Sequence, residues 1–186
     1  LKVGGIPILE RIVMDFAKNG FTRIVMCLGY KQDVVKKYFG NGKNFGVEIT
    51  YILENERLGT AGALMLIDFQ LDDSFFVMNG DLLTNVNYCN ILEFHNDSKS
   101  NATMCVREYD FKVPFGVVNI DKGFITSIVE KPVHNFYVNA GIYVLNPECI
   151  NLIPDNRYFD MTSLFQEMIN KGLNSGPFPV KEYWLD

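Results

Sequence analysis

Apolar runs and amphipathic stretches alternate along the first half of the sequence, and this order constrains the fold more than any other feature. After Pro7, which suits the first turn of a helix, apolar residues recur at helical spacing from Ile8 to Phe16. Further strands are predicted at residues 23–29, 47–53 and 74–79, and further helices at residues 32–39, 60–69 and 88–96. Such alternation is typical of a parallel sheet with helices on both faces.

The second half of the sequence follows a different pattern, with strand candidates and little helix between them. The predicted strands are residues 102–108, 115–121, 123–131 and 140–146, followed by a helix at residues 159–172 and an extended segment at residues 176–186. No repeat or low-complexity linker interrupts the chain. We therefore expect one α/β domain, residues 1–186, with a Rossmann-like mixed, mainly parallel sheet, helices on both faces and an antiparallel extension.

Charge and cysteine usage exclude several classes of function. The net charge is −5 and no basic stripe is present, so neither a nucleic acid nor a membrane is indicated as a partner. No apolar run approaches the roughly 20 residues that span a bilayer, and no signal peptide is visible, so we expect a cytoplasmic protein. The cysteines and histidines lack metal-ligand spacing, which disfavours zinc and favours reduced core thiols; they are Cys27, Cys89, Cys105, Cys149, His95 and His134.

A single carboxylate, Asp81, follows the predicted strand at residues 74–79 and is preceded by Gly80. In open α/β sheets, ligands bind beyond the carboxyl ends of the strands, and glycine permits a close approach of the backbone. A solvent-facing aspartate in a turn is the simpler explanation of this segment taken alone.

Three other short segments carry weak signals of the same kind. The segment LGTAGAL (58–64) places small residues at the start of a helix, where free N–H groups can meet a base, a ribose or a phosphate, although tight packing also selects small residues. The segment VEKP (129–132) ends an apolar strand in an acid and a base, a common surface pattern. The segment EYWLD (182–186) places a second acid, Asp186, after an aromatic run.

The order and spacing of these segments resemble the sugar-1-phosphate nucleotidylyltransferases, and most closely the mannose-1-phosphate guanylyltransferase-like branch. The matching segments are KVGGIPILE, YFGNGKNFGVEI, LGTAGAL, NGD, PFGVV, EKP, NAGIYVL and EYWLD. The resemblance covers essentially the whole chain and implies a fold of the nucleotide-diphospho-sugar transferase type. It also implies a reaction in which a nucleoside triphosphate (NTP) and a sugar 1-phosphate give a nucleoside diphosphate sugar (NDP-sugar) and pyrophosphate.

The resemblance also implies roles for individual residues. Asp81 and Asp186 match the two aspartates that bind Mg²⁺, and Lys131 matches the lysine that contacts the sugar phosphate; all three are catalytic candidates. The implied nucleotide-binding residues are Glu54, Gly59, Thr60 and Gly80. The implied sugar-binding residues are Gly116, Glu130 and Asn139.

Glu54 bears on the choice of base. It lies five residues before Gly59, where family members carry a polar residue that reads the base edge. A carboxylate accepts two hydrogen bonds, and guanine offers two adjacent donors, whereas uracil and thymine offer one donor flanked by acceptors. The hypothesis is a preference for GTP; the competing interpretation is that Glu54 faces water.

The chain departs from the family pattern at both ends. The family opens with a strand and a glycine-rich loop that binds the triphosphate, and this chain begins just after that loop. We therefore expect a piece truncated at both ends, with an open edge in its central sheet and without full activity.

Two other functions remain open from the sequence. The oligomeric state also remains open, and a homo-oligomer is one of the alternatives. One function is a metal-dependent glycosyltransferase that uses a nucleotide sugar, but its candidate acidic pair, Asp72–Asp73, precedes a strand rather than following it. The other is a non-catalytic regulator that binds a nucleotide sugar. The presence of Asp81, Lys131 and Asp186 together argues against the regulator, because such a protein needs no metal clamp.

Overall fold

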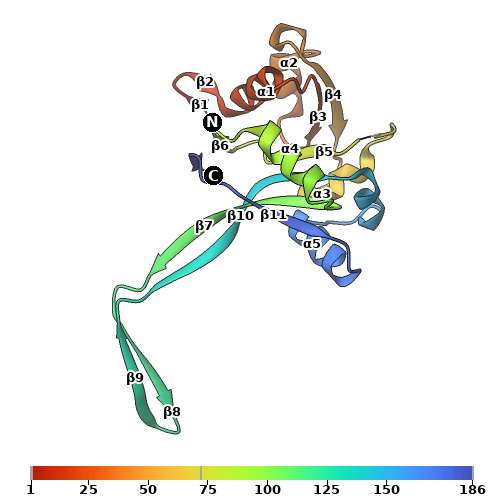
Figure 1. Ribbon diagram of the computed structural model, residues 1–186. Coiled ribbons are helices and arrows are strands. Elements are labelled where there is room, and N and C mark those ends of the chain that lie inside the picture. The colour runs from red at the N-terminus through yellow and green to blue at the C-terminus, as the bar shows by residue number, and fades with distance from the viewer. Residues whose placement is uncertain (1, 72, 186) are drawn as a thin grey trace.

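A computed structural model describes residues 2–71 and 73–185, in which a helical body carries a long projecting ribbon of strands (Figure 1). The first elements are β1 (Lys2–Val3), β2 (Ile6–Pro7), α1 (Ile8–Lys18), β3 (Arg23–Leu28), α2 (Gln32–Phe39), the 3₁₀ turn η1 (Lys43–Phe45) and β4 (Glu48–Leu53). Strands β3 and β4 pair in parallel, as the alternating pattern predicts. Val13, Met26 and Ile49 are among the buried residues that join α1 to this sheet.

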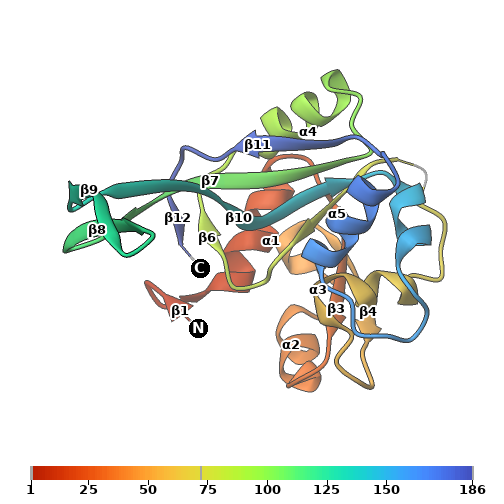
Figure 2. The same ribbon diagram turned by 90° about the horizontal axis from the view of Figure 1, so that it is seen from below.

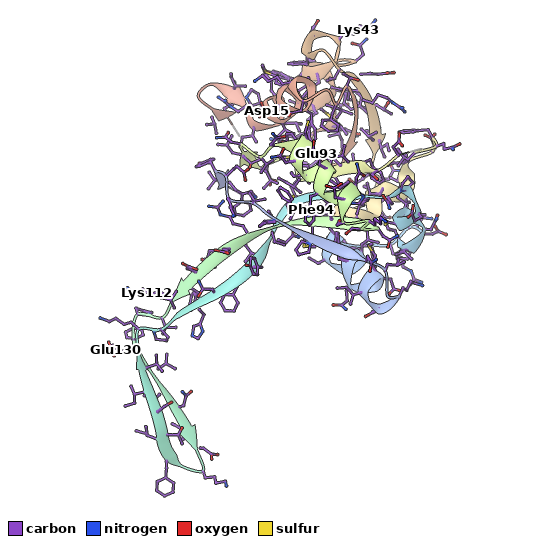
Figure 3. The ribbon with its side chains drawn as sticks, in the orientation of Figure 1. Asp15, Lys43, Glu93, Phe94, Lys112 and Glu130 are labelled. Carbon is purple, nitrogen blue, oxygen red and sulfur yellow. The ribbon has the colours of Figure 1, made fainter. Side chains whose placement is uncertain are left out.

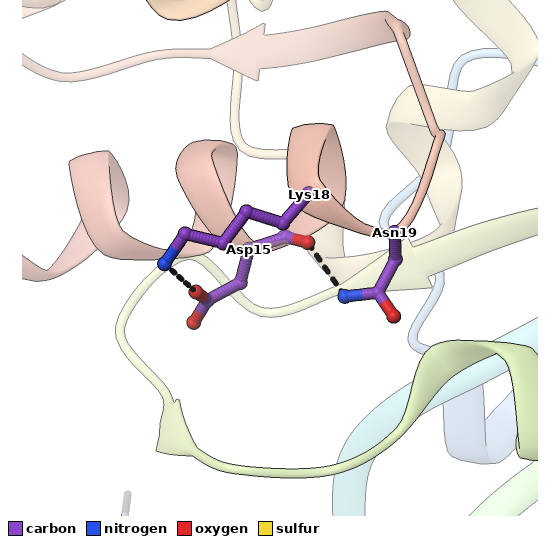
Figure 4. A network of polar contacts seen from close by, with 3 residues as sticks. All are labelled: Asp15, Lys18 and Asn19. Carbon is purple, nitrogen blue, oxygen red and sulfur yellow. Dashed lines mark hydrogen bonds and ion pairs between the residues drawn. The ribbon is translucent and has the colours of Figure 1, made fainter.

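Helix α1 ends at a small polar network before Gly20 (Figure 4). The side-chain amide of Asn19 donates to the carbonyl of Asp15 at 2.8 Å, and Lys18 Nζ lies 3.5 Å from the Asp15 carboxylate. The Asp15 carbonyl therefore accepts twice, from the side-chain amide of Asn19 and from the Asn19 backbone N–H at 3.2 Å, and this double contact closes the last turn of the helix. On the apolar side of the helix, the Phe16 ring stacks on Tyr88 at a centroid distance of 4.3 Å, so α1 also packs against α4 (Tyr88–Asp97).

The central sheet has the order β11-β7-β10-β5, with β10 antiparallel to both of its neighbours and β11 parallel to β7. Its strands are β5 (Phe75–Met78), β7 (Ala102–Lys112), β10 (Val133–Leu145) and β11 (Ser175–Pro179). Alternate residues of β10 face opposite sides of the sheet. Ile142 and Val144 pack in the cluster that contains α4, whereas Tyr143 and Leu145 pack in the cluster that contains α5 (Met161–Asn170). Helices therefore cover both faces of the sheet (Figure 2), and the predicted mixed α/β class is confirmed.

The sheet is interrupted. Strands β3 and β4 form a separate pair, and among the described residues no strand pairs with the outer edge of β5. The outer edge of β5 is therefore open within the described residues.

Strands β7 and β10 extend beyond the body and continue into a hairpin of β8 (Gly116–Asp121) and β9 (Phe124–Glu130), as Figure 1 shows. We call residues 108–137 the arm. Nearly every arm side chain is exposed, including large apolar ones such as Phe115, Phe124 and Phe136. Strand β10 begins at Val133, earlier than the predicted residue 140, because the whole base of the arm is paired.

The remaining elements are short. They are α3 (Gly59–Gly62), η2 (Ala63–Leu66), β6 (Leu83–Thr84), η3 (Pro147–Leu152) and β12 (Trp184–Leu185). The predicted helix at residues 60–69 is wrong in its second half, because the chain turns into 3₁₀ geometry at Ala63 and is extended by Ile67. Within the described residues, no helix is both long and apolar enough to cross a membrane.

The cysteines are free, and the expectation of core thiols holds for two of them. Cys105 and Cys149 are fully buried, and burial is the main cause that raises their pKa values to about 12 and about 11, respectively. Cys89 is exposed on α4, so the prediction of a core position is wrong there; it faces away from the sheet, unlike Tyr88 and Ile91 of the same helix.

Candidate active site

The loop after β5 holds the candidate metal ligand Asp81. Asp81 is exposed, and the backbone N–H of Asn79 donates to the carbonyl of Gly141 at 3.0 Å. Gly80 is exposed, and a Cβ built there would lie 3.6 Å from Leu9 of α1. The turn is therefore held between β10 and α1, with the carboxylate of Asp81 toward solvent.

The NAG segment of β10 lies directly against this loop. The pairing of β10 with β7 shifts register between Asn139 and Tyr143, and Gly141 has a φ of +70°. A Cβ at Gly141 would lie 2.8 Å from Asn79 Nδ2 and 3.0 Å from a methyl carbon of Leu82. Asn139 fixes the bulge by accepting from the Gly141 N–H at 2.9 Å and donating to the Tyr143 hydroxyl at 2.6 Å. Glycine suits this position because its φ is positive and because a Cβ would displace the side chains of Asn79 and Leu82.

The last described residues reach the same place. The indole N–H of Trp184 donates to the carbonyl of Ala140 at 2.8 Å. Strand β12 pairs with β6, so that Leu185 lies opposite Leu83, two positions after Asp81. Asp186, the second candidate metal ligand, lies outside the described residues. Three segments that are far apart in the sequence, NGD, NAG and EYWL, thus meet at one point of the fold.

Arg107 of β7 is a residue of this site that sequence reasoning missed. Its Nη1 donates to the carbonyl of Glu182 at 2.7 Å, and its guanidinium lies 6.0 Å from the centre of the Trp184 ring. Arg107 therefore holds the segment that leads into β12 through a hydrogen bond and a cation–π contact. One arginine in a strand pattern has no distinguishing signal in the sequence.

A second group of candidates lies beyond the ends of β3 and β4, around a pocket of about 210 Å³. The pocket is lined by Gly29, Tyr30, Glu54, Asn55, Glu56 and Arg57. Glu54 is half-buried, and one of its carboxylate oxygens accepts from the Leu58 N–H at 3.3 Å. Burial, followed by the nearby Glu54 charge, raises the pKa of Cys27 to about 11, so this thiol stays neutral behind the pocket.

Gly59 and Thr60 are the first residues of α3, and one side of both residues packs against Phe159 and Asp160. The Thr60 N–H and hydroxyl both donate to Asp160 Oδ1, at 3.0 and 3.2 Å. The Thr60 N–H first, and then the hydroxyls of Tyr158 and Thr60, lower the pKa of Asp160 by hydrogen bonding to its carboxylate, against a smaller opposing effect of burial. The stability that they contribute is present above the ordinary aspartate pKa and is lost as the pH falls through the lowered value. Packing thus accounts for the polar atoms of Thr60, and a contact of this residue with nucleotide stays a prediction.

The remaining sugar-site candidates lie together, but in the arm. Gly116 pairs with Glu130 across the hairpin, and Lys131 Nζ lies 3.9 Å from a Glu130 carboxylate oxygen. Lys131 has a φ of +47°, which turns the chain at the end of β9. Figure 3 shows Glu130 far out on the arm, away from the body. The structure therefore groups Asp81, Gly80 and Asn139 in the body and Gly116, Glu130 and Lys131 in the arm, and the assigned roles stay predictions.

Comparison with known proteins gives matches along the whole chain. A family model described as nucleotidyl transferase matches residues 1–186. Mannose-1-phosphate guanyltransferase 2 of Candida glabrata is 34% identical over 194 residues, which cover 97% of this chain and 52% of that protein. A UTP–glucose-1-phosphate uridylyltransferase of Synechocystis is 30% identical over 206 residues, which cover 97% of this chain and 53% of that protein. The chain thus spans about half the length of the curated relatives that it matches.

Solved structures match the fold as well. The crystal structure of HddC from Yersinia pseudotuberculosis superposes with a TM-score of 0.76 at 27% identity, covering 100% of this chain and 82% of that one. The similarity therefore extends over both the body and the sequence segments that carry the candidate site.

Proposed function

Because the chain belongs to the nucleotidyl transferase family, we propose that the protein transfers a nucleoside monophosphate from an NTP, preferably GTP, to a sugar 1-phosphate. The products are an NDP-sugar and pyrophosphate. A cytoplasmic location and a possible assembly into homo-oligomers belong to the same proposal.

The observation that carries the proposal is the meeting of NGD, NAG and EYWL. The hydrogen bond between Trp184 and the Ala140 carbonyl joins two of the segments, and the close approach of Gly141 to Asn79 joins the third. Three segments that are far apart in the sequence thus meet at the loop that carries one exposed carboxylate, Asp81. Clustered polar groups beyond the ends of sheet strands are typical of ligand sites in open α/β folds.

The same place fits a magnesium ion. Asp81 is exposed, and the pairing of Leu185 with Leu83 brings the end of the described chain to the loop that contains it. Within residues 2–71 and 73–185, no group of three or more His, Cys, Asp and Glu side chains forms a metal cage. Mg²⁺ does not require one, because it is commonly bound through one or two carboxylates and substrate phosphates. We assign Asp81 and Asp186 as those carboxylates; when bound, the ion would offset charge on the phosphates.

The proposed roles of the other residues follow from charge and hydrogen bonding. The sugar phosphate attacks the α-phosphorus through one of its oxygens, and pyrophosphate leaves with the electron pair of the broken P–O bond. With a second phosphate pKa near 6, the attacking oxygen is already ionised at pH 7, so no general base is needed. Glu54 accepts from the base, and Lys131 offsets the charge of the sugar phosphate while Glu130 accepts from sugar hydroxyls. These last two roles require the arm to approach the NGD loop when substrates bind.

The test is a matrix of four NTPs and several sugar 1-phosphates, in which pyrophosphate and NDP-sugar are both measured. We expect the highest turnover with GTP, and a loss of about 100-fold or more in Asp81→Asn, because the change removes one metal-binding charge. Asp97→Asn, at an exposed position at the end of α4, is the matched control and should retain activity.

Three results would overturn the proposal. Sugar transfer from an NDP-sugar to an acceptor without pyrophosphate release would identify a glycosyltransferase. Binding of an NDP-sugar by a wild-type protein that never turns over would identify a non-catalytic regulator. Full activity in Asp81→Asn would remove the carboxylate from the mechanism.

A further inference from the structure

The starts of helices α3 and α5 are bonded to each other, although they lie about a hundred residues apart in the chain. The Asp160 carboxylate, just before α5, accepts from the N–H and the hydroxyl of Thr60 in the first turn of α3. In return, the Thr60 hydroxyl oxygen accepts from the N–H of Met161, the first residue of α5, at 2.8 Å. Each side chain thereby satisfies an N–H that the start of the other helix leaves without an intrahelical partner.

The backbone on either side of this exchange is bonded as well. The Phe159 carbonyl accepts from the N–H groups of Ala61 and Gly62, both at 2.9 Å, and the Phe159 N–H donates to the Leu58 carbonyl at 2.7 Å. A Cβ at Gly59 would lie 2.7 Å from the Phe159 carbonyl oxygen. The small residues of LGTAG are therefore required by residues 157–160, which lie directly against them.

The contacts continue from this strap, residues 157–160, to the pocket. Leu58, whose carbonyl is bonded to Phe159, donates its own N–H to the Glu54 carboxylate at 3.3 Å. Glu54 also has its backbone N–H bonded to the Leu28 carbonyl of β3 at 2.9 Å. The backbone of Glu54 is thus held by the sheet, and its carboxylate is held by Leu58, which the strap contacts.

We propose that Asp160 is a positioning residue for nucleotide binding, which acts through the strap and Leu58 to hold the Glu54 carboxylate toward the pocket. This inference rests on the proposed function, because it takes the pocket at Glu54 as the site of the base. In this proposal Asp160 acts without touching the nucleotide: its Oδ1 accepts from both donors of Thr60, and the Tyr158 hydroxyl also hydrogen-bonds to its carboxylate. The Asp160 carboxylate accepts from the N–H of Thr60, and the Glu54 carboxylate accepts from the N–H of Leu58, so the two acids hold two ends of the same short segment, residues 58–60.

The test compares Asp160→Ala, Asp160→Asn and the matched control Asp155→Ala, which removes an exposed acid from the segment just before the strap. We expect Asp160→Ala to raise the KM for GTP about tenfold, because a displaced binding group loses a large part of its interaction. The KM for the sugar 1-phosphate and kcat should change about twofold or less. Asp160→Asn keeps a carbonyl oxygen that can accept from Thr60, so it should restore most of the affinity, and Asp155→Ala should match wild type.

GTP affinity is also measured directly by calorimetry, without sugar phosphate, so that the inference can be judged even if turnover fails. A wild-type protein that binds GTP without turnover would contradict the proposed function, whereas the ratio of GTP affinities between wild type and Asp160→Ala would still decide the inference. Unchanged GTP affinity in Asp160→Ala would overturn it. An increase confined to the KM of the sugar phosphate would overturn the inference as well. So would an equal loss in GTP affinity, both KM values and kcat together with a lower unfolding temperature. A wild-type protein that binds no GTP would also overturn it.

Discussion

At the scale of single residues, the candidate site depends on positions that favour one residue type, and Gly141 is the clearest example. Gly141 has a φ of +70°, and the space beside its α-carbon is occupied by Asn79 and Leu82. Gly172, after α5, has nearly the same φ, +71°, but nothing lies within 4 Å of the Cβ that could be built there. The two glycines therefore separate the cost of backbone conformation from the cost of a steric contact.

We expect Gly141→Ala to lower the free energy of unfolding by about 2 kcal/mol or more, and Gly172→Ala by about 1 kcal/mol, as measured by urea denaturation. The larger loss reflects the contact with Asn79, and Gly141→Ala should also lower turnover, because the displaced loop carries Asp81. Equal losses in the two variants would mean that NAG and NGD do not press against each other.

The base preference is a second prediction at this scale. Glu54→Gln replaces one of two acceptors by a donor, so we expect the preference for GTP over UTP and dTTP, expressed as a ratio of kcat/KM values, to fall about tenfold. Glu48→Gln, at the exposed start of β4, the strand that Glu54 directly follows, is the control and should leave the ratio unchanged. A ratio unaltered in Glu54→Gln would show that Glu54 does not read the base.

Two residues that support the candidate site, Arg107 and Asp160, have no signature in the sequence. Each is a single polar residue in an ordinary strand or helix-start pattern, and its role depends on partners that are far away in the chain, Glu182 and Thr60. Asp81 could be found because a carboxylate follows an apolar strand directly. The difference is that local patterns report local neighbours, whereas these contacts are made only by the folded chain.

At the scale of elements, the sequence predicts most helices and strands, and the errors have local causes. The amphipathic helix α2 and the apolar strands β3 and β5 lie where periodicity places them. The helix at residues 60–69 is cut short because its first turn is fixed by the strap, while Leu64 and the residues after it form a continuous apolar run with no single buried helical face. Periodicity predicts an element only where one face is buried.

Strand β12 is only two residues long, and its place depends on Trp184. Trp184→Phe removes the hydrogen bond to the Ala140 carbonyl, so we expect a loss of about 1 kcal/mol or more in unfolding free energy, followed by circular dichroism, and a lower kcat. Tyr183→Phe, at the exposed neighbouring position, is the matched control and should have little effect. If both variants behave like wild type, β12 is held by other contacts and the indole is not its anchor.

At the scale of the whole molecule, body and arm differ in how they are stabilised. The body has buried clusters on both faces of its sheet, whereas the arm is a two-stranded ribbon with exposed apolar side chains. Two strands without a covering layer are only marginally stable. The sequence predicts the antiparallel extension, but it does not predict that the apolar side chains of the extension stay exposed, because alternating strands such as β8 and β9 favour a covered face that the described residues do not supply.

Hydrogen exchange should therefore separate the two parts. We expect the amides of the β8–β9 hairpin, for example Val117 and Ile128, to exchange much earlier than those of Thr103 and Val144 in the buried sheet, because local opening of the arm exposes little apolar surface. The measurement is native-state exchange by mass spectrometry on peptic fragments. Equal protection in arm and body would show that the arm packs against something in solution.

Within residues 2–71 and 73–185 no strand pairs with the outer edge of β5, and this edge can therefore accept an added strand. Its N–H and C=O groups form a template on which an extended peptide can gain a full ladder of main-chain bonds, in the way that pilin subunits are completed by a donor strand. A synthetic peptide with alternating apolar residues and a free edge of its own should then raise the melting temperature of the chain in proportion to the logarithm of the peptide concentration. At high protein concentration, the same edge would bind other molecules of the chain.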